Sequence, residues 1–140
     1  MSSKSFTPML WDCERQGCFN KKKRLKFEVF ADCLPGKISF SDIDAIVEIN
    51  GNLLIMEWKG HSNVPVGQKI MFKQITRFCP ALILVVEGNA EDMSVSRIQT
   101  VWHGEFLPAI EAGIEQLVTK INKWANWAKI NPVTPQKYVT

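Results

Sequence analysis

The chain has 140 residues, of which 46% are hydrophobic and 22% are charged, and its formal net charge is +3. This is an ordinary globular composition with enough apolar side chains for one core, so a single domain is expected. The mildly basic charge permits a nucleic-acid partner without requiring one. No apolar run approaches the roughly 20 residues that span a bilayer, and residues 1–10 contain no apolar signal segment. These features predict a soluble, cytoplasmic protein with no membrane partner.

The cysteines bear on a possible metal site. There are four of them, Cys13, Cys18, Cys33 and Cys79. The first two have a C-x4-C spacing, and a zinc site would need two further ligands converging from Cys33, His61 or His103. Without a secretory signal a disulfide framework is not expected. The sequence therefore favours free thiols, with Cys33 and Cys79 packed as small hydrophobic residues.

The first part of the chain predicts an arm followed by a helix. Residues 1–19 lack periodicity and are expected to be an irregular arm. Asn20 is a suitable N-cap for a helix that runs to Leu34, and Pro35-Gly36 would end it. The helix would open with a basic run, which is a solvated face or a set of phosphate contacts. That run comprises Lys21, Lys22, Lys23 and Arg24.

The central part predicts strands. A short strand is expected at Ile38–Phe40, and residues 43–49 predict a second one from their alternation. Asn50-Gly51 is the strongest short signal for a two-residue hairpin turn. It joins the second strand to a third, Asn52–Lys59, and the apolar residues along both strands indicate central positions in a sheet.

The remaining segments predict an α/β domain with a mixed central sheet. A helix is expected at Gln68–Phe78, followed by a strand at Ala81–Val86 that is buried on both faces because its apolar run is continuous. Residues 94–102 predict a further strand near the sheet edge. A C-terminal helix follows at Ala109–Ala128 from its helical spacing of apolar residues. The domain would cover residues 20–130 and leave a loose tail at 131–140.

The hairpin brings ionisable side chains together. With a two-residue turn at Asn50-Gly51, paired residues sum to 101, so Asp44 faces Glu57 and Asp42 faces Lys59. Side chains on one face of such a pair are separated by about 4.5–5.5 Å between Cβ atoms. Two carboxylates this close repel each other unless a cation lies between them or one is protonated. A divalent cation with oxygen ligands explains the pattern; an Asp42–Lys59 ion pair with Glu57 exposed is the structural alternative.

Asp44 and the Glu57-Trp58-Lys59 run, on the two sides of a hairpin, resemble the PD-(D/E)XK nuclease superfamily. The resemblance covers about half the chain and extends to small phage-encoded members. It implies a restriction-endonuclease-like core of a helix, three strands, a helix and a fourth strand, which is the order expected for residues 20–87. The family's proline is absent, because Ser41 precedes Asp42 and Ile43 precedes Asp44.

The resemblance also implies a site. Mg2+ (or Mn2+) would be bound by Asp44, Glu57 and the Trp58 carbonyl, with Glu28 on the first helix as a further acid and Asp42 as the alternative aspartate. Lys59 would act on the attacking water and on developing charge.

Two further features belong to the implied site. Gln68-x3-Phe72 is similar to a Gln-x3-Tyr motif of RecB-like members, with Phe in place of Tyr, so Gln68 is a candidate catalytic residue. His61 joins the basic run as a candidate phosphate contact. The other histidine, His103, precedes Gly104 in an expected turn, and two distant histidines do not favour nucleophilic hydrolase chemistry.

The functional expectation is a Mg-dependent deoxyribonuclease, endo- or exonucleolytic, acting in a host cytoplasm if the chain is phage-encoded. DNA is the expected partner, and a homodimer is left open. One alternative is a nucleic-acid-binding or host-inhibiting phage protein on a nuclease fold with little or no catalysis. A second alternative is a structural zinc protein that uses Cys13 and Cys18.

Overall fold

A computed structural model describes residues 25–61 and 63–135, and the chain divides into two compact units, Met1–Phe40 and Ser41–Thr140. The expected arm at 1–19, the Asn20 cap, the basic run at 21–24 and the end of the tail lie outside the described residues. In the second unit the structure is α/β with a mixed six-stranded sheet and two α-helices.

The described part of the first unit lacks the expected helix. A single 3-10 turn, η1 (Phe27–Phe30), is present and buries none of its residues. Val29 is 76% exposed, and a short helix without a packed apolar face is unstable in water. The expected strand at Ile38–Phe40 is also wrong. Phe40 instead packs against both Phe27 and Phe30, with ring centroids 5.8 Å apart in each pair.

The sheet of the second unit has the order β1-β2-β3-β4-β5, with β6 also paired to β4. Only β2 and β3 are parallel to each other. They are joined by α2 (Val66–Phe78). The strands are β1 (Ala45–Ile49), β2 (Asn52–Lys59), β3 (Ala81–Asn89), β4 (Ser94–Trp102), β5 (Glu105–Phe106) and β6 (Ile110–Glu111).

The predicted hairpin is confirmed in both turn and register. Ile49 pairs with Asn52 and Ala45 pairs with Met56, so paired residues sum to 101. Asn50 has φ 52° and Gly51 has φ 86°, which are the positive values that a type I′ turn requires at both central positions. The chain after α3 contacts this turn, since the Val133 N–H donates to the Asn50 carbonyl over 2.9 Å.

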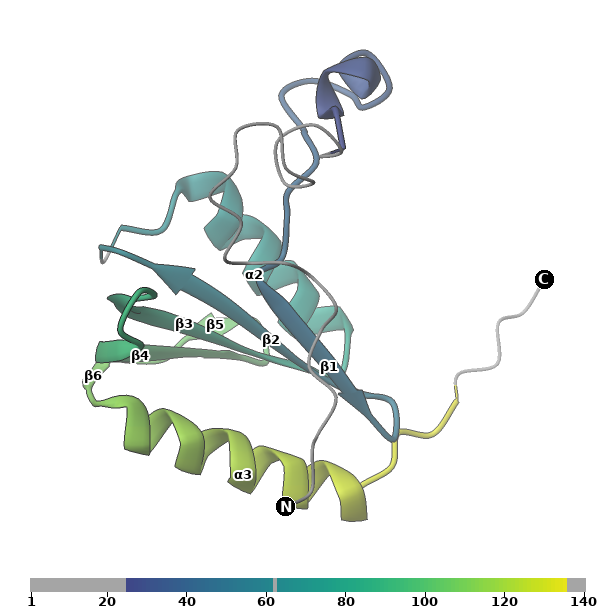
Figure 1. Ribbon diagram of the computed structural model, residues 1–140. Coiled ribbons are helices and arrows are strands. Elements are labelled where there is room, and N and C mark those ends of the chain that lie inside the picture. The colour runs from purple at the N-terminus through teal and green to yellow at the C-terminus, as the bar shows by residue number, and fades with distance from the viewer. Residues whose placement is uncertain (1–24, 62, 136–140) are drawn as a thin grey trace. The chain divides into compact units, whose positions relative to one another are not determined.

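The two helices cover opposite faces of the sheet, with α2 on one side and α3 (Ile114–Ile130) on the other (Figure 1). Alternate residues of the central strands supply two separate apolar clusters. The cluster under α2 contains Ile55, Val64, Phe72, Ile83, Val85 and Val101. The cluster under α3 contains Leu54, Leu84, Val86, Ile98, Leu117, Trp124 and Ala128.

The structure confirms one of three sequence predictions about element positions and corrects the other two. Strand β3 is buried on both faces, as its apolar run predicts. The expectation that both hairpin strands are central is wrong for β1, which lies at an edge of the sheet with Ile46 56% exposed. The C-terminal helix begins at Ile114 instead of Ala109, because Ile110 and Glu111 pair with β4 as β6.

Within the described residues, neither helix is long and apolar enough to cross a membrane. Both described cysteines, Cys33 and Cys79, are free and exposed, so their expected burial among hydrophobic residues is wrong. Cys79 follows the last residue of α2 and Cys33 lies in the turn after η1, and these positions leave their side chains outside both apolar clusters.

Candidate functional site at the carboxyl ends of the parallel strands

The candidate site lies where the parallel strands β2 and β3 end and α2 begins. Open α/β sheets bind ligands in the crevice outside the carboxyl ends of their parallel strands, because the connecting segments leave that end uncovered. Here the end of β2 is the Glu57-Trp58-Lys59 run, and the register pairs Glu57 with Val85 and Lys59 with Glu87. The sequence motif therefore lies at the carboxyl end of a parallel strand.

Glu57 is the only buried carboxylate among the described residues, with 6% of its surface exposed. Its Oε1 atom accepts a hydrogen bond of 2.9 Å from Gln68 Nε2 and lies 3.4 Å from the Lys59 ammonium nitrogen. Gln68 is in the first turn of α2, whose N-terminus carries partial positive charge. Burial of an ionised carboxylate is thus offset by one cation, one amide donor and a helix N-terminus.

Asp44 precedes β1 and its side chain is exposed. Its Oδ2 atom accepts a hydrogen bond of 2.7 Å from the backbone N–H of Trp58. Continuing the hairpin register by one residue places Asp44 across from Glu57. Because β1 begins only at Ala45, no β1 carbonyl is available to the Trp58 N–H, and the Asp44 carboxylate accepts that hydrogen bond instead.

The same hydrogen bond fixes the direction of the Trp58 carbonyl. In an antiparallel ladder the N–H and C=O of one residue project to the same neighbouring strand. Since the Trp58 N–H points to Asp44, the Trp58 carbonyl also projects to the side where β1 has ended. Asp44, Glu57 and this carbonyl are three oxygen donors from one end of one hairpin.

Gln68 has an unusual hydrogen-bond state. Its amide nitrogen binds Glu57, while its amide oxygen is buried and has no hydrogen-bond partner among the described residues. A buried acceptor without a donor costs about 1–3 kcal/mol. A water or a ligand group that donates to this oxygen would remove that cost, which makes Gln68 a second indication of a binding site beside Glu57.

Sequence analysis missed two charged residues near this end of the sheet, Glu87 and Arg97. In the strand register Glu87 lies opposite Lys59 of β2 and opposite Arg97 of β4. Glu87 and Arg97 line a small cavity of about 40 Å3 together with His61. The sequence signal that could have found Glu87 is its position directly after the apolar run of β3, where the strand leaves the core.

Other predicted residues lie outside this cluster. Asp42 is exposed in a segment without regular structure, and no described residue forms a hydrogen bond or ion pair with it. Phe72 is 1% exposed and packs near Phe106 in the apolar cluster under α2, so the aromatic position of the Gln-x3-Phe pattern belongs to the core. His103 lies in the β4–β5 turn with its ring against Trp102.

Two further candidates, His61 and Glu28, are exposed. His61 accepts the Asn63 N–H through Nδ1 over 3.2 Å, which fixes the ring in its loop. Glu28 lies in η1 of the first unit. The phosphate contacts expected from Lys21, Lys22, Lys23 and Arg24 lie outside the described residues, as do Cys13 and Cys18 of the zinc alternative.

The oxygen donors at the end of the hairpin are of the kind that a hard divalent cation takes. Within residues 25–61 and 63–135 no group of three or more His, Cys, Asp or Glu side chains is arranged to hold a metal. A closed structural zinc site requires about four such ligands. Mg2+, in contrast, is bound through one or two carboxylates with water and substrate phosphate completing its octahedron. Asp44 and Glu57 supply two carboxylates, and the Trp58 carbonyl supplies a third oxygen at the same end of the hairpin.

Comparisons with known proteins add no relative: no protein-family model, no curated protein and no solved structure matches the chain.

Proposed function

We propose that the protein is a metal-dependent nuclease of the PD-(D/E)XK type that hydrolyses phosphodiester bonds, with DNA as its substrate. The observation that carries the proposal is the position of Asp44, Glu57 and Lys59 at the end of one hairpin, where Glu57 is buried beside Lys59 and Asp44 accepts a hydrogen bond from the backbone of Trp58. In this proposal the hairpin, α2 and β3 form part of a restriction-endonuclease-like core.

Each residue has a definable task. Asp44, Glu57 and the Trp58 carbonyl would hold Mg2+ or Mn2+. A divalent cation held there supplies charge neutralisation for the phosphate and lowers the barrier to attack by water. The Lys59 ammonium, 17% exposed at the edge of the cluster, is available to a phosphate oxygen and to charge that develops in the transition state. Gln68 is a positioning residue, since its amide fixes one oxygen of Glu57.

A second function is favoured by the Glu57–Lys59 ion pair itself. Their separation of 3.4 Å accounts for both charges without a metal, as expected for a protein that binds nucleic acid on the same fold without cutting it. The two functions differ in one measurable property, because only the nuclease requires Asp44 to hold a cation.

The test is cleavage of labelled duplex, single-stranded, flap and four-way-junction DNA with Mg2+, Mn2+, Ca2+ or EDTA. Cleavage is expected with Mg2+ or Mn2+, little turnover with Ca2+ because of its looser geometry, and none with EDTA. Asp44→Asn, Glu57→Gln and Lys59→Met should each lower the rate by about 10²-fold or more.

Two matched variants serve as controls. Asp42→Asn removes an exposed aspartate only two residues from Asp44, and Glu91→Gln removes an exposed glutamate in the β3–β4 turn. Both should retain activity within about threefold, as surface changes away from a site do. Undiminished cleavage in excess chelator would exclude the metal mechanism. Loss in Asp42→Asn without loss in Asp44→Asn would mean that the wrong aspartate is assigned.

A further inference from the structure

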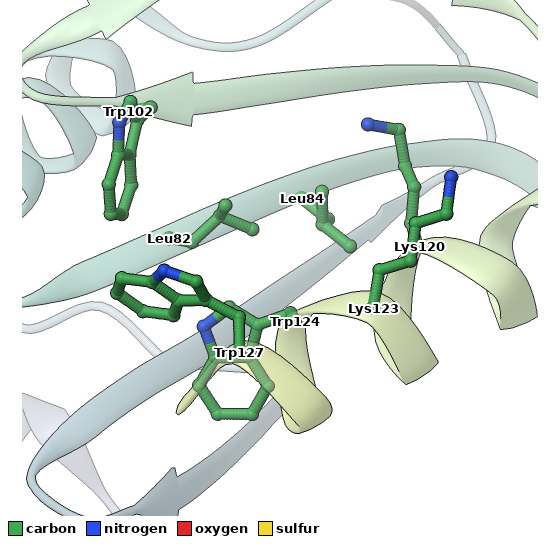
Figure 2. Close-up of a pocket in the computed structure, with 7 residues that line it drawn as sticks. All are labelled: Leu82, Leu84, Trp102, Lys120, Lys123, Trp124 and Trp127. Carbon is green, nitrogen blue, oxygen red and sulfur yellow. The ribbon is translucent and has the colours of Figure 1, made fainter. Parts of the chain in front are cut away.

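A second cavity lies on the opposite face of the sheet, between β3, β4 and α3, and is independent of the proposed nuclease site. Its volume is about 280 Å3. Leu82 and Leu84 of β3 form its floor, and three indole rings form its walls, those of Trp102, Trp124 and Trp127 (Figure 2). Such a lining of apolar and aromatic side chains is typical of small-molecule sites.

The walls are held in place by packing. Trp124 is 7% exposed and belongs to the apolar cluster under α3. Trp102 and Trp127 contact each other edge to face with centroids 6.2 Å apart, a favourable geometry for two aromatic rings. Trp127 is nevertheless 42% exposed. A large apolar ring thus remains in contact with solvent beside a cavity that a ligand could fill.

Charge is present at one end only. Lys120 and Lys123 line the cavity from α3, and Figure 2 shows both at the end away from Trp102. The Lys120 ammonium group donates to the Thr100 hydroxyl over 3.4 Å, which holds it toward the sheet. No acidic side chain is among the residues that line the cavity. The cavity therefore has an apolar body and a cationic end without an internal counter-charge.

We infer that this cavity binds a small amphipathic anion, with an apolar body between the indoles and a carboxylate, sulfonate or phosphate at Lys120 and Lys123. A volume of 280 Å3 equals the share of roughly nine water molecules in the liquid, which suits a saturated chain of about ten carbons or a fused aromatic ring. A nucleobase fits less well, because no hydroxyl, amide or carboxylate side chain lines the walls and the polar edges of the base would lose their hydrogen bonds.

The probes are decanoate, decanol and thymidine 5′-monophosphate, titrated into the full-length protein and followed by tryptophan fluorescence and calorimetry. Decanoate is expected to bind saturably and one to one, decanol more weakly, and the nucleotide not measurably. Lys120→Met/Lys123→Met keeps the aliphatic stems and removes both charges. It should weaken decanoate binding about tenfold and change decanol binding by less than about twofold.

Lys129→Met is the matched control, since Lys129 lies in the last turn of α3 and does not line the cavity. It should leave decanoate binding unchanged. Trp127→Ala, at an exposed position with little risk to folding, should weaken both ten-carbon probes. The inference is overturned by non-saturable binding, by equal decanoate affinity in the double lysine variant, or by tighter binding of the nucleotide. It is also overturned if sedimentation shows a dimer that Trp127→Ala dissociates, since a second copy would then cover the cavity.

Discussion

Strand β2 presents Leu54 to α3 and Ile55 and Glu57 to α2, so consecutive residues of one strand meet two different environments. Under α3 the buried side chains of the sheet form an apolar cluster with Trp124 of the helix. Under α2 the last residue that β2 gives to the apolar cluster is Ile55, four residues before the strand ends at Lys59, and the buried carboxylate of Glu57 follows on the same face. Each face has one covering helix, yet only the α2 face carries a buried charge among the described residues.

The difference shows where the sheet buries a charge that folding alone does not favour. Apolar burial stabilises the α3 face by about 25 cal/mol per Å2 of surface removed from water. A buried carboxylate costs several kcal/mol before its partners are counted, and apolar replacements of buried ion pairs are often neutral or stabilising. An apolar pair could therefore be equally stable at this position, which makes Glu57 with Lys59 a candidate for a functional role.

The largest expected effect is a loss of stability on the apolar face. Leu84 is 1% exposed under α3, and Leu84→Ala should lower the free energy of unfolding by about 2–5 kcal/mol because it leaves a cavity. Urea denaturation followed by circular dichroism measures the loss. Leu82→Ala, at a half-buried position on the same strand and face, should cost clearly less. Equal losses would show that the depth of burial does not decide the cost of truncating a leucine on this face.

The second expected effect belongs to the charged face. A divalent cation that binds Asp44 and Glu57 should stabilise the folded state by about 2.7 kcal/mol at a concentration of 100 times its Kd. Thermal unfolding with and without Mn2+ measures the gain. Asp44→Asn should abolish it, whereas Asp42→Asn should retain it. An equal gain in both variants would place the ion elsewhere, whatever the nuclease assays give.

The third effect tests the ion pair on that face without metal. Lys59→Met leaves Glu57 buried without its cation and should lower the free energy of unfolding by about 1–3 kcal/mol, between the values for exposed and buried pairs. Glu57→Gln/Lys59→Met removes both charges and should recover most of that loss, giving a favourable coupling energy in a double-mutant cycle. A double variant as unstable as Lys59→Met would show that Lys59 acts through its packing and not through its charge.

The sequence predicted the charged face better than its surroundings. The hairpin register followed from Asn50-Gly51 alone, because both residues adopt positive φ readily and a two-residue turn fixes every pair beyond it. Gln68, which the resemblance named, donates a hydrogen bond to Glu57, and its catalytic role stays a prediction. The role of Phe72 could not be read from the pattern, because an aromatic residue one helical turn further on is equally suited to a core.

The wrong predictions share a physical cause. The helix expected up to Leu34 had apolar periodicity, but η1 in the described part of that segment buries none of its residues, and periodicity carries little stability without tertiary contacts. Residues 110–111 continue the helical pattern of α3 in the sequence, but in the structure they form β6, which pairs with the edge of β4. Glu87 and Arg97 reach the crevice only through strand pairings that are distant in sequence, which no local pattern encodes.

The smallest effect concerns a carboxylate that lies on neither face. Asp92, in the β3–β4 turn, accepts hydrogen bonds from the Ser94 hydroxyl and from the Ser94 backbone N–H, and these hold its pKa below the usual 3.8. A depressed pKa in the folded state means that the stabilisation is present above the unfolded pKa and is lost as the pH falls through the folded one. Asp92→Asn should therefore lower stability slightly at pH 7 and not at pH 2.

Ser94→Ala should raise the Asp92 pKa toward 3.8 in an NMR titration of the carboxyl carbon, because the hydroxyl is the larger cause of the shift. An unchanged pKa in Ser94→Ala would assign the effect to the backbone N–H alone. Asp92 is fully exposed, so these variants measure how much hydrogen bonds to a carboxylate contribute to stability without burial. That contribution is the reference for the buried carboxylate of Glu57.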